Sequence, residues 1–167
     1  MRNNKGFSLI EIMTVMGILA ILAGVAVPSF MAWRHNAQLR RAAQDVYSNL
    51  QKAKVEAARR NTAITITFSS NDYVVYVDAN SDWTYQDGEE IARPIAWSNY
   101  AGVSMDTSEG GGDGLTFANP INGFAFGPNG FPMDKDEFIS PGTVFIKNQK
   151  NKKSSIVVSP AGNIRIN

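Results

Sequence analysis

Cysteine is absent from the 167 residues, and histidine occurs once. Without thiols the chain has neither a disulfide framework nor a thiolate metal site, so its fold depends on packing. A charge excess of one sign is also lacking, because 16 basic residues stand against 15 acidic ones. Binding to bulk nucleic acid through overall charge is therefore not indicated, and any basic surface must be local.

Recognisable catalytic motifs are missing as well. The sequence contains no phosphate-binding loop, no G-x-S-x-G motif and no pair of histidines at metal-ligand spacing. A Ser/His/Asp site would have to use His35, which lies two residues after the end of a long apolar run. The sequence therefore predicts a protein without enzymatic activity and without a cofactor.

Hydrophobic residues are concentrated near the N-terminus. From Phe7 to Trp33 the only charged residue is Glu11. At ~1.5 Å per residue this run makes about 40 Å of helix, enough to cross a hydrocarbon core of ~30 Å. Arg2 and Lys5 precede the run and, by the positive-inside tendency, keep the N-terminus cytoplasmic. We expect one transmembrane helix over residues 7–33, with the C-terminal part outside.

Glu11 carries the strongest physical indication of function. A carboxylate inside an apolar span costs about 2.5 to 3.5 kcal/mol on insertion scales, so it needs a partner. No basic residue follows it on the same helix within a few turns, which makes a partner on another molecule the natural candidate. The alternative is a protonated glutamate whose carboxyl reaches the membrane interface.

The segment Lys5-Gly6-Phe7-Ser8-Leu9-Ile10-Glu11 resembles the processing site of type IV prepilins and type II secretion pseudopilins. The resemblance implies that residues 1–6 are a leader, that prepilin peptidase cuts between Gly6 and Phe7, and that the new N-terminal Phe7 is N-methylated. It also implies that Glu11 pairs with the α-amine of Phe7 in a neighbouring subunit during assembly. The alternative is an ordinary secretory signal cleaved after Gly24-Val25-Ala26.

Pro28 lies inside the predicted helix, at a place where the pilin family also has a proline. A proline removes one i→i−4 hydrogen bond, and Gly24 lowers helix propensity nearby. We therefore expect a kink or local melting here, which would help the subunit fit a filament.

Beyond Trp33 the apolar pattern becomes periodic, with alternating spacings of four and three that are typical of an amphipathic helix. The stripe consists of Leu39, Ala43, Val46, Leu50, Ala53 and Ala57. One helix is predicted from about residue 7 to residue 60, with a transmembrane half (7–33) and an amphipathic half (34–61) that packs on a head. A coiled-coil seam is the alternative, but a stripe this rich in alanine makes a weak one.

The remainder, residues 62–167, has the period of two that indicates β-strands, interrupted by Gly, Pro, Asn and Asp clusters. Strands are expected at 64–68, 73–77, 91–97, 102–105, 115–118, 123–127, 143–147, 154–159 and 163–166. The glycine-rich segment 108–114 is expected to be a mobile loop. The sequence thus predicts an α+β protein: a long N-terminal helix packed on an antiparallel, β-sandwich-like head.

Several head segments resemble the GspH/FimT branch of the pseudopilins, among them Phe126-Gly127-Pro128-Asn129-Gly130 and the C-terminal Ser159-Pro160-Ala161-Gly162-Asn163. The resemblance implies a pilin-like fold and a minor pseudopilin or minor pilin. Such a subunit sits in the bacterial inner membrane with its head in the periplasm. It then joins other pilins through its N-terminal helix, at or near the tip of a type II secretion pseudopilus or type IV pilus, and supports protein secretion.

Asp78, Asn80, Asp82 and Glu89 fall at offsets 1, 3, 5 and 12 of a calcium-binding loop. Trp83 stands where the sharp turn of such a loop needs glycine, and strands rather than helices are predicted on both sides. A loop of Asx turns is therefore favoured over a calcium site.

A basic run near the C-terminus is the candidate nucleic-acid contact: Lys147, Lys150, Lys152, Lys153 and Arg165. DNA-uptake members of the branch carry two arginines after the glycine that matches Gly162, but here Asn163 replaces the first. With no interleaved aromatic residues, a solvated hairpin tip is favoured over a competence or adhesion pilin that binds DNA. The alternative from another class is a plain membrane-anchored or secreted binding domain.

Overall fold

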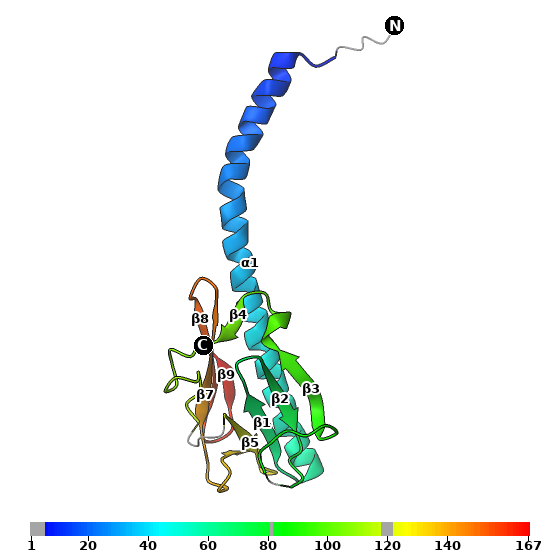
Figure 1. Cartoon of the computed structure of the whole chain (residues 1–167), viewed down its shortest axis with the longest axis vertical. Helices are drawn as coiled ribbons and strands as arrows, with labels where there is room; N and C mark the ends of the chain where they lie inside the picture. The colour runs from blue at the N-terminus through cyan, green and yellow to red at the C-terminus, as the bar shows by residue number, and fades with distance from the viewer. Residues whose placement is uncertain (1–5, 81, 118–121) are drawn as a thin grey trace. The chain divides into compact units, whose positions relative to one another are not determined.

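The structure, a computed structural model, describes residues 6–80, 82–117 and 122–167. Of the predicted leader, residues 1–5 lie outside this range. The chain divides into two compact units, residues 1–34 and 35–167. The long helix α1, Leu9–Arg60, supplies most of the first unit and the first element of the second (Figure 1).

The two ends of α1 have local causes. At the start, Ser8 precedes the first helical residue, and its carbonyl accepts a hydrogen bond from the backbone N–H of Ile12 at 3.3 Å. At the end, Asn61 adopts a left-handed backbone conformation with φ of 51°, which asparagine tolerates better than most residues. The N–H of Thr62 then bonds back to the carbonyl of Ala57 at 3.2 Å and closes the helix.

Nine strands in the described part of the head form two sheets in which every pairing is antiparallel. The first sheet has the order β3 (Glu90–Ala96), β2 (Asp72–Tyr76), β1 (Ile64–Phe68), β5 (Gly123–Phe126), β6 (Pro132–Met133). The second has the order β4 (Val103–Met105), β7 (Gly142–Asn148), β8 (Lys153–Val158), β9 (Ile164–Ile166). A short 3-10 helix, η1 (Trp97–Asn99), leads from the first sheet to the second.

The predicted strands correspond to observed ones within about one residue, with two exceptions. The segment predicted as a strand at 115–118 forms only an isolated bridge, between Leu115 and Val144, and its residue 118 lies outside the described range. Strand β6 was not predicted. It is only two residues long, and its first residue, Pro132, has no backbone N–H to donate to a sheet, so proline is not expected in a strand.

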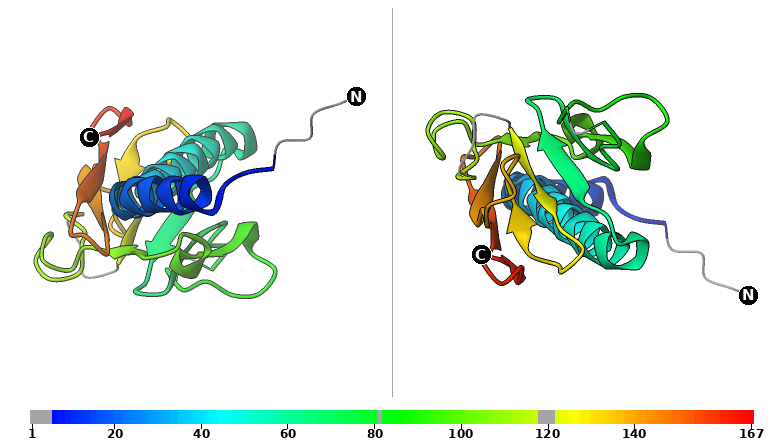
Figure 2. Two further views of the ribbon diagram at one scale, coloured as in Figure 1. Left: turned by 90° about the horizontal axis from the view of Figure 1, so that it is seen from above. Right: turned by 90° about the horizontal axis from the view of Figure 1, so that it is seen from below.

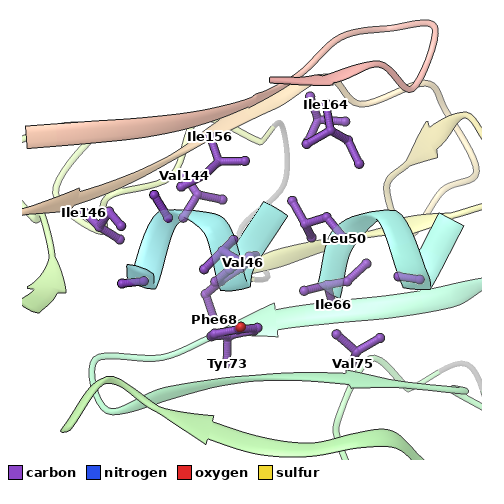
Figure 3. Close-up of a cluster of buried hydrophobic side chains, with 14 of the residues drawn as sticks. Val46, Leu50, Ile66, Phe68, Tyr73, Val75, Val144, Ile146, Ile156 and Ile164 are labelled. Atoms are coloured by element: carbon purple, nitrogen blue, oxygen red, sulfur yellow. The ribbon is translucent and has the colours of Figure 1, made fainter. Parts of the chain in front are cut away.

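The amphipathic half of α1 lies between the two sheets (Figures 2 and 3). In Figure 3, Val46 and Leu50 of the helix face Ile66 on one side and Ile156 on the other. All six residues of the predicted stripe are buried, together with Ala42. The prediction of core packing is therefore confirmed, and so is the fold class, with the added detail that one hydrophobic cluster joins the helix to both sheets.

Candidate assembly surface

The part of α1 that belongs to the first unit, residues 9–34, is exposed at every position. Its most apolar 18-residue window has a mean hydropathy of 2.4 and is 0% buried. Among the described residues, α1 is the one helix long and apolar enough to cross a membrane. Large hydrophobic side chains are exposed along its whole length, from Phe7 at 79% to Trp33 at 59%. This surface must be covered by lipid or by other helices.

Glu11 lies in the first turn of α1, where a negative charge faces the positive end of the helix dipole. Its backbone N–H donates to Ser8 Oγ at 3.3 Å, so Ser8 caps the helix. Ser8 and Glu11 thus hold the N-cap and N3 positions of the capping-box sequence pattern, with the bond to the Ser8 hydroxyl formed. This role was not predicted, although the spacing S-x-x-E from Ser8 to Glu11 signals it in the sequence.

Around Glu11 the surface is apolar. A shallow groove is lined by Phe7, Glu11, Ile12, Val15 and Met16. Glu11 is the one titratable side chain of that lining, and it forms no ion pair with any described residue. The arrangement offers a single carboxylate with a hydrophobic surround, which is the chemistry that an ammonium group carried by another apolar helix would match.

Pro28 does not interrupt the helix. A kink or local melting was expected between Gly24 and Pro28; residues 9–60 are helical without a break, so local melting is wrong, and a kink stays a prediction. The physical reason is that proline removes a single i→i−4 bond, while the residues around it keep theirs. A role for Pro28 in fitting the subunit into a filament stays a prediction.

Hydrogen bonds fasten the amphipathic half of α1 to the head. The Tyr100 hydroxyl donates to Asp45 at 2.7 Å, and Asn49 Nδ2 donates to the Tyr73 hydroxyl at 2.8 Å. Burial raises the pKa of Tyr73 to about 12, against the smaller opposing effect of the Asn49 hydrogen bond. Burial and the bond to Asp45 also raise the pKa of Tyr100, so both phenols remain protonated at neutral pH.

A second tie joins three distant segments. Lys54 on α1 donates from Nζ to the carbonyl of Gly162 at 2.8 Å. Gly162 has φ of +71°, and a Cβ there would collide with the carbonyl oxygen of Gly130. Gly130 in turn has φ of +77°, with a Cβ position 2.9 Å from Lys54 Cε. Both glycines belong to segments on which the family resemblance rests, and the close approach is a physical reason for glycine at each.

The structure divides the predicted basic run. Lys147 and Lys153 each lie 2.9 Å from the buried carboxylate of Asp106, and Lys153 lies 2.6 Å from Glu109. Burial would raise the pKa of Asp106, but hydrogen bonds from Ser108 and the two lysines outweigh it and hold this pKa well below its ordinary value. These two lysines are therefore committed to an internal ion cluster.

Lys150 and Lys152 are different: they are exposed at the tip of the β7–β8 hairpin and form no ion pair with any described residue. Arg165 is exposed on β9 opposite Val157. Val157 is five residues beyond Lys152, or about 16 Å along an extended strand. The structure thus separates Arg165 from the lysines at the tip, and a nucleic-acid contact through this set stays a prediction.

The candidate calcium ligands instead hold turns. The Asp78 carboxylate accepts the backbone N–H groups of Asp82 at 3.1 Å and Trp83 at 2.7 Å. Asp82 accepts from Asn80 Nδ2 at 2.8 Å, and Glu89 accepts from the backbone of Gln86 at 3.2 Å. Two further bonds are Asx turns, in which Asn80 Oδ1 accepts the backbone N–H of Asp82 at 3.2 Å and Asp82 Oδ1 accepts that of Thr84 at 2.7 Å. Within the described ranges, no group of three or more acidic, His or Cys side chains is placed to hold a metal ion.

Segment 108–114 makes hydrogen bonds at both of its ends. The backbone N–H of Glu109 bonds to the carbonyl of Asp106 at 3.1 Å, and that of Gly114 bonds to the carbonyl of Glu109 at 3.2 Å. The expected mobility of this loop stays a prediction. Asp106 was not predicted as a functional or structural site, because a single acid between Met105 and Thr107 carries no signal until the lysines of β7 and β8 are placed beside it.

Comparisons with known proteins agree with this architecture. The family model for the type II transport protein GspH matches residues 42–162, and the prokaryotic N-terminal methylation motif matches residues 1–27. The pilin-like protein PilA1 of Thermus thermophilus is 33% identical over 106 residues, which are 61% of this chain and 67% of that protein. The type IV wide pilus major component PilA4 of the same species is 32% identical over 97 residues, which are 48% of this chain and 71% of that protein.

Two solved structures share the fold. The minor pseudopilin EpsH from the type 2 secretion system of Vibrio cholerae superposes with a TM-score of 0.54 at 12% identity, over 78% of this chain and 96% of that one. The type IV minor pilin FimU of Pseudomonas aeruginosa superposes with a TM-score of 0.52 at 16% identity, over 81% of this chain and 92% of that one. At these identities the likeness shows the fold, with a helix packed on antiparallel sheets.

Proposed function

The chain belongs to the GspH family of type II transport proteins, and we propose that it assembles at or near the tip of a type II secretion pseudopilus or type IV pilus. It is a structural subunit of the pseudopilin and pilin class and not an enzyme. At the tip it supports protein secretion.

The exposed surface of residues 7–33 carries the proposal. None of its apolar 18-residue window is buried within the chain, yet the surface includes a carboxylate in its first turn. A bilayer covers such a helix before assembly, and other helices of the same kind cover it afterwards. In the filament, Glu11 accepts the α-amine of Phe7 of an adjacent subunit, which neutralises both charges.

The position near the tip is supported by the similarity to EpsH, described as a minor pseudopilin, and to FimU, described as a minor pilin. A subunit present in few copies cannot build a shaft that repeats along its length, but it can occupy an end.

Processing precedes assembly in this proposal. The match to the methylation motif over residues 1–27 supports removal of residues 1–6 by prepilin peptidase and N-methylation of Phe7. Before assembly the protein crosses the bacterial inner membrane once, with its head in the periplasm. Arg2 and Lys5 ahead of the apolar run favour this orientation.

The test is the intact mass of the mature protein from its native host, combined with a Gly6→Leu variant. A Cβ at Gly6 would meet no atom within 4 Å, so a larger side chain there does not disturb the fold. Wild type should start at N-methylated Phe7, whereas Gly6→Leu should keep its leader and stay out of filaments. Gly17→Ala is the matched control, because its Cβ also meets nothing, and it should be processed normally. A mature wild type that begins after Ala26 overturns the proposal.

A further inference from the structure

The tip of the β7–β8 hairpin lies beside the beginning of the helix half that belongs to the head. Asn148, the last residue of β7, donates from Nδ2 to Oδ1 of Asn36 at 3.1 Å. In Figure 1 the hairpin, in orange, rises along the part of α1 that opens the second unit. Asn148 and Asn36 are 112 residues apart in the sequence, and their bond brings the lysines of the hairpin tip, Lys150 and Lys152, close to Asn36.

Asn36 follows the end of the apolar run by only three residues, since that run ends at Trp33. Three residues of helix rise by about 4.5 Å. The headgroup layer on each side of a bilayer is about 5 to 8 Å thick, and tryptophan is enriched at its boundary with the hydrocarbon. When residues 7–33 span the membrane, Asn36 and whatever is bonded to it are therefore at the depth of the lipid headgroups.

The hairpin tip is held in one conformation. Asn148 Oδ1 accepts the backbone N–H groups of Lys150 at 2.9 Å and Lys152 at 3.0 Å, and Asn151 takes the left-handed φ of 56° that the turn requires. The side chain of Gln149 rests on Gly102, where a Cβ would come within 2.7 Å of it. A rigid turn presents its side chains without a large loss of conformational entropy on binding.

The charge on this tip is unneutralised. Lys147 and Lys153, which flank the tip, are paired with Asp106 and Glu109. By contrast, Lys150 and Lys152 are exposed and form no ion pair with any residue of the described ranges. Arg40, one helical turn after Asn36 on the same side of α1, is also exposed and without such a pair. Three free cations therefore gather near Asn36.

We propose that Lys150 and Lys152, supported by Arg40, bind the headgroups of anionic phospholipids in the membrane that anchors the chain. The surface holds the head in a fixed orientation on the bilayer before the subunit enters a filament. This inference rests on the proposed function, because it requires residues 7–33 to span a membrane. Duplex DNA offers the same phosphate chemistry, but a tip at headgroup depth faces lipid phosphates first.

The test uses the full chain reconstituted into vesicles. Gln149→Cys introduces the one cysteine of the chain, which carries a nitroxide label whose relaxation by headgroup-chelated nickel reports contact with lipid. Each lysine near an anionic surface contributes about a fivefold preference, so Lys150→Gln with Lys152→Gln should lower the equilibrium constant for contact roughly 25-fold. Contact should be stronger with phosphatidylglycerol than with phosphatidylcholine alone, and it should fall at high salt.

The matched control is Lys52→Gln with Lys135→Gln, which removes the same charge from two exposed lysines elsewhere. Lys52 is 16 residues after Asn36, or about 24 Å along the helix. This variant should behave as the wild type does. Equal contact in both lipids, or no effect of the Lys150 and Lys152 changes, overturns the inference.

Two further measurements separate the remaining outcomes. A gel shift of duplex DNA by the detergent-solubilised chain that depends on Lys150 and Lys152, without lipid contact, assigns the tip to DNA and overturns the inference. Extraction of the chain from vesicles by alkali shows that residues 7–33 do not span the membrane, in which case the proposed function fails as well. If the chain stays in the membrane but the nitroxide label is not relaxed by the headgroup-chelated nickel, the lipid inference is wrong and the proposed function stands.

Discussion

At the level of single residues, Glu11 combines two roles that substitutions separate. Its backbone N–H completes the cap at Ser8 Oγ, whereas its carboxylate is available to a cation from another subunit. Glu11→Gln preserves the capping box, in which glutamine also serves at N3, but removes the charge. Loss of one partner of a desolvated ion pair costs about 3 to 5 kcal/mol, so incorporation into filaments should fall about 100-fold or more. Immunoblots of sheared filaments measure this.

Ser8→Ala is the complementary control for Glu11. It removes the cap and keeps the carboxylate, at a cost of about 1 kcal/mol in helix stability. We expect near-normal incorporation for Ser8→Ala. If Glu11→Gln assembles normally while Ser8→Ala does not, Glu11 serves the cap and the intersubunit ion pair is wrong.

Asp106 provides the clearest pH dependence in the head. Its carboxylate is 0% exposed and meets two lysines, so its pKa in the folded state lies below the ordinary 3.8. A lowered folded-state pKa means that the stabilisation is complete above about pH 4 and is lost as the pH falls toward the folded-state value. Asp106→Asn should lower the free energy of unfolding by about 2 kcal/mol at pH 7. Urea denaturation followed by the fluorescence of buried Trp97 measures both effects.

The control for Asp106 is Glu109→Gln, which removes the exposed partner of Lys153 and should cost less than ~1 kcal/mol. The difference between wild type and Asp106→Asn should shrink as the pH is lowered below 4, because the carboxyl of the unfolded wild-type chain becomes protonated there while that of the folded chain stays charged. A difference that stays constant down to pH 2 would contradict the role of the buried charge.

At the level of secondary-structure elements, Gly162 in the β8–β9 turn lies directly against Gly130 in the β5–β6 turn, so that a turn of one sheet meets a turn of the other. Gly162→Ala must place a Cβ against the Gly130 carbonyl oxygen in a left-handed conformation. The combined strain should lower the free energy of unfolding by about 2 to 4 kcal/mol. Thermal unfolding of the detergent-solubilised chain measures the change.

Gly111→Ala is the matched control for Gly162. Gly111 has a similar φ of +82°, but a Cβ there would meet no atom within 4 Å. It therefore reports the backbone strain alone, about 1 kcal/mol. Equal losses of stability in the two variants would mean that the close approach to Gly130 contributes nothing.

Most elements of the fold follow from local sequence patterns. The helical period identified the buried stripe of α1 because Leu39, Val46 and Leu50 all lie on one face of the helix and all pack into the same hydrophobic core. Strand β7 alternates between buried and half-buried residues, as a period of two requires. In contrast, β6 depends on its pairing with β5 rather than on its own two residues, so no local signal identified it.

The functional surfaces were predictable only in part. The run from Phe7 to Glu11 carries its signal in contiguous residues, and the sequence therefore identified it. The four lysines of the C-terminal run look equivalent in sequence, but Asp106, 41 residues before Lys147, selects two of them for an ion cluster. Such a division needs a tertiary contact, and the same holds for the bond between Asn36 and Asn148 that places the other two.

At the level of the whole molecule, the two compact units differ in what stabilises them. Every buried residue of the hydrophobic core belongs to residues 35–167, and the described residues before position 35 contribute none. A truncated chain that starts at His35 should therefore fold by itself and retain the unfolding free energy of the head to within about 1 kcal/mol. Urea denaturation and near-UV circular dichroism of this soluble chain provide the measurement.

The boundary of the folding unit can be located by a second truncation. A chain that starts at Gln44 loses Leu39, which is 3% exposed, and the hydrogen bond from Asn148 to Asn36. Loss of one buried leucine costs about 2 to 5 kcal/mol, a large part of the stability of a small domain. This chain should therefore unfold at much lower urea concentration than the one that starts at His35. Equal stability of the two would mean that the first turns of the amphipathic half belong functionally to the membrane segment rather than to the head.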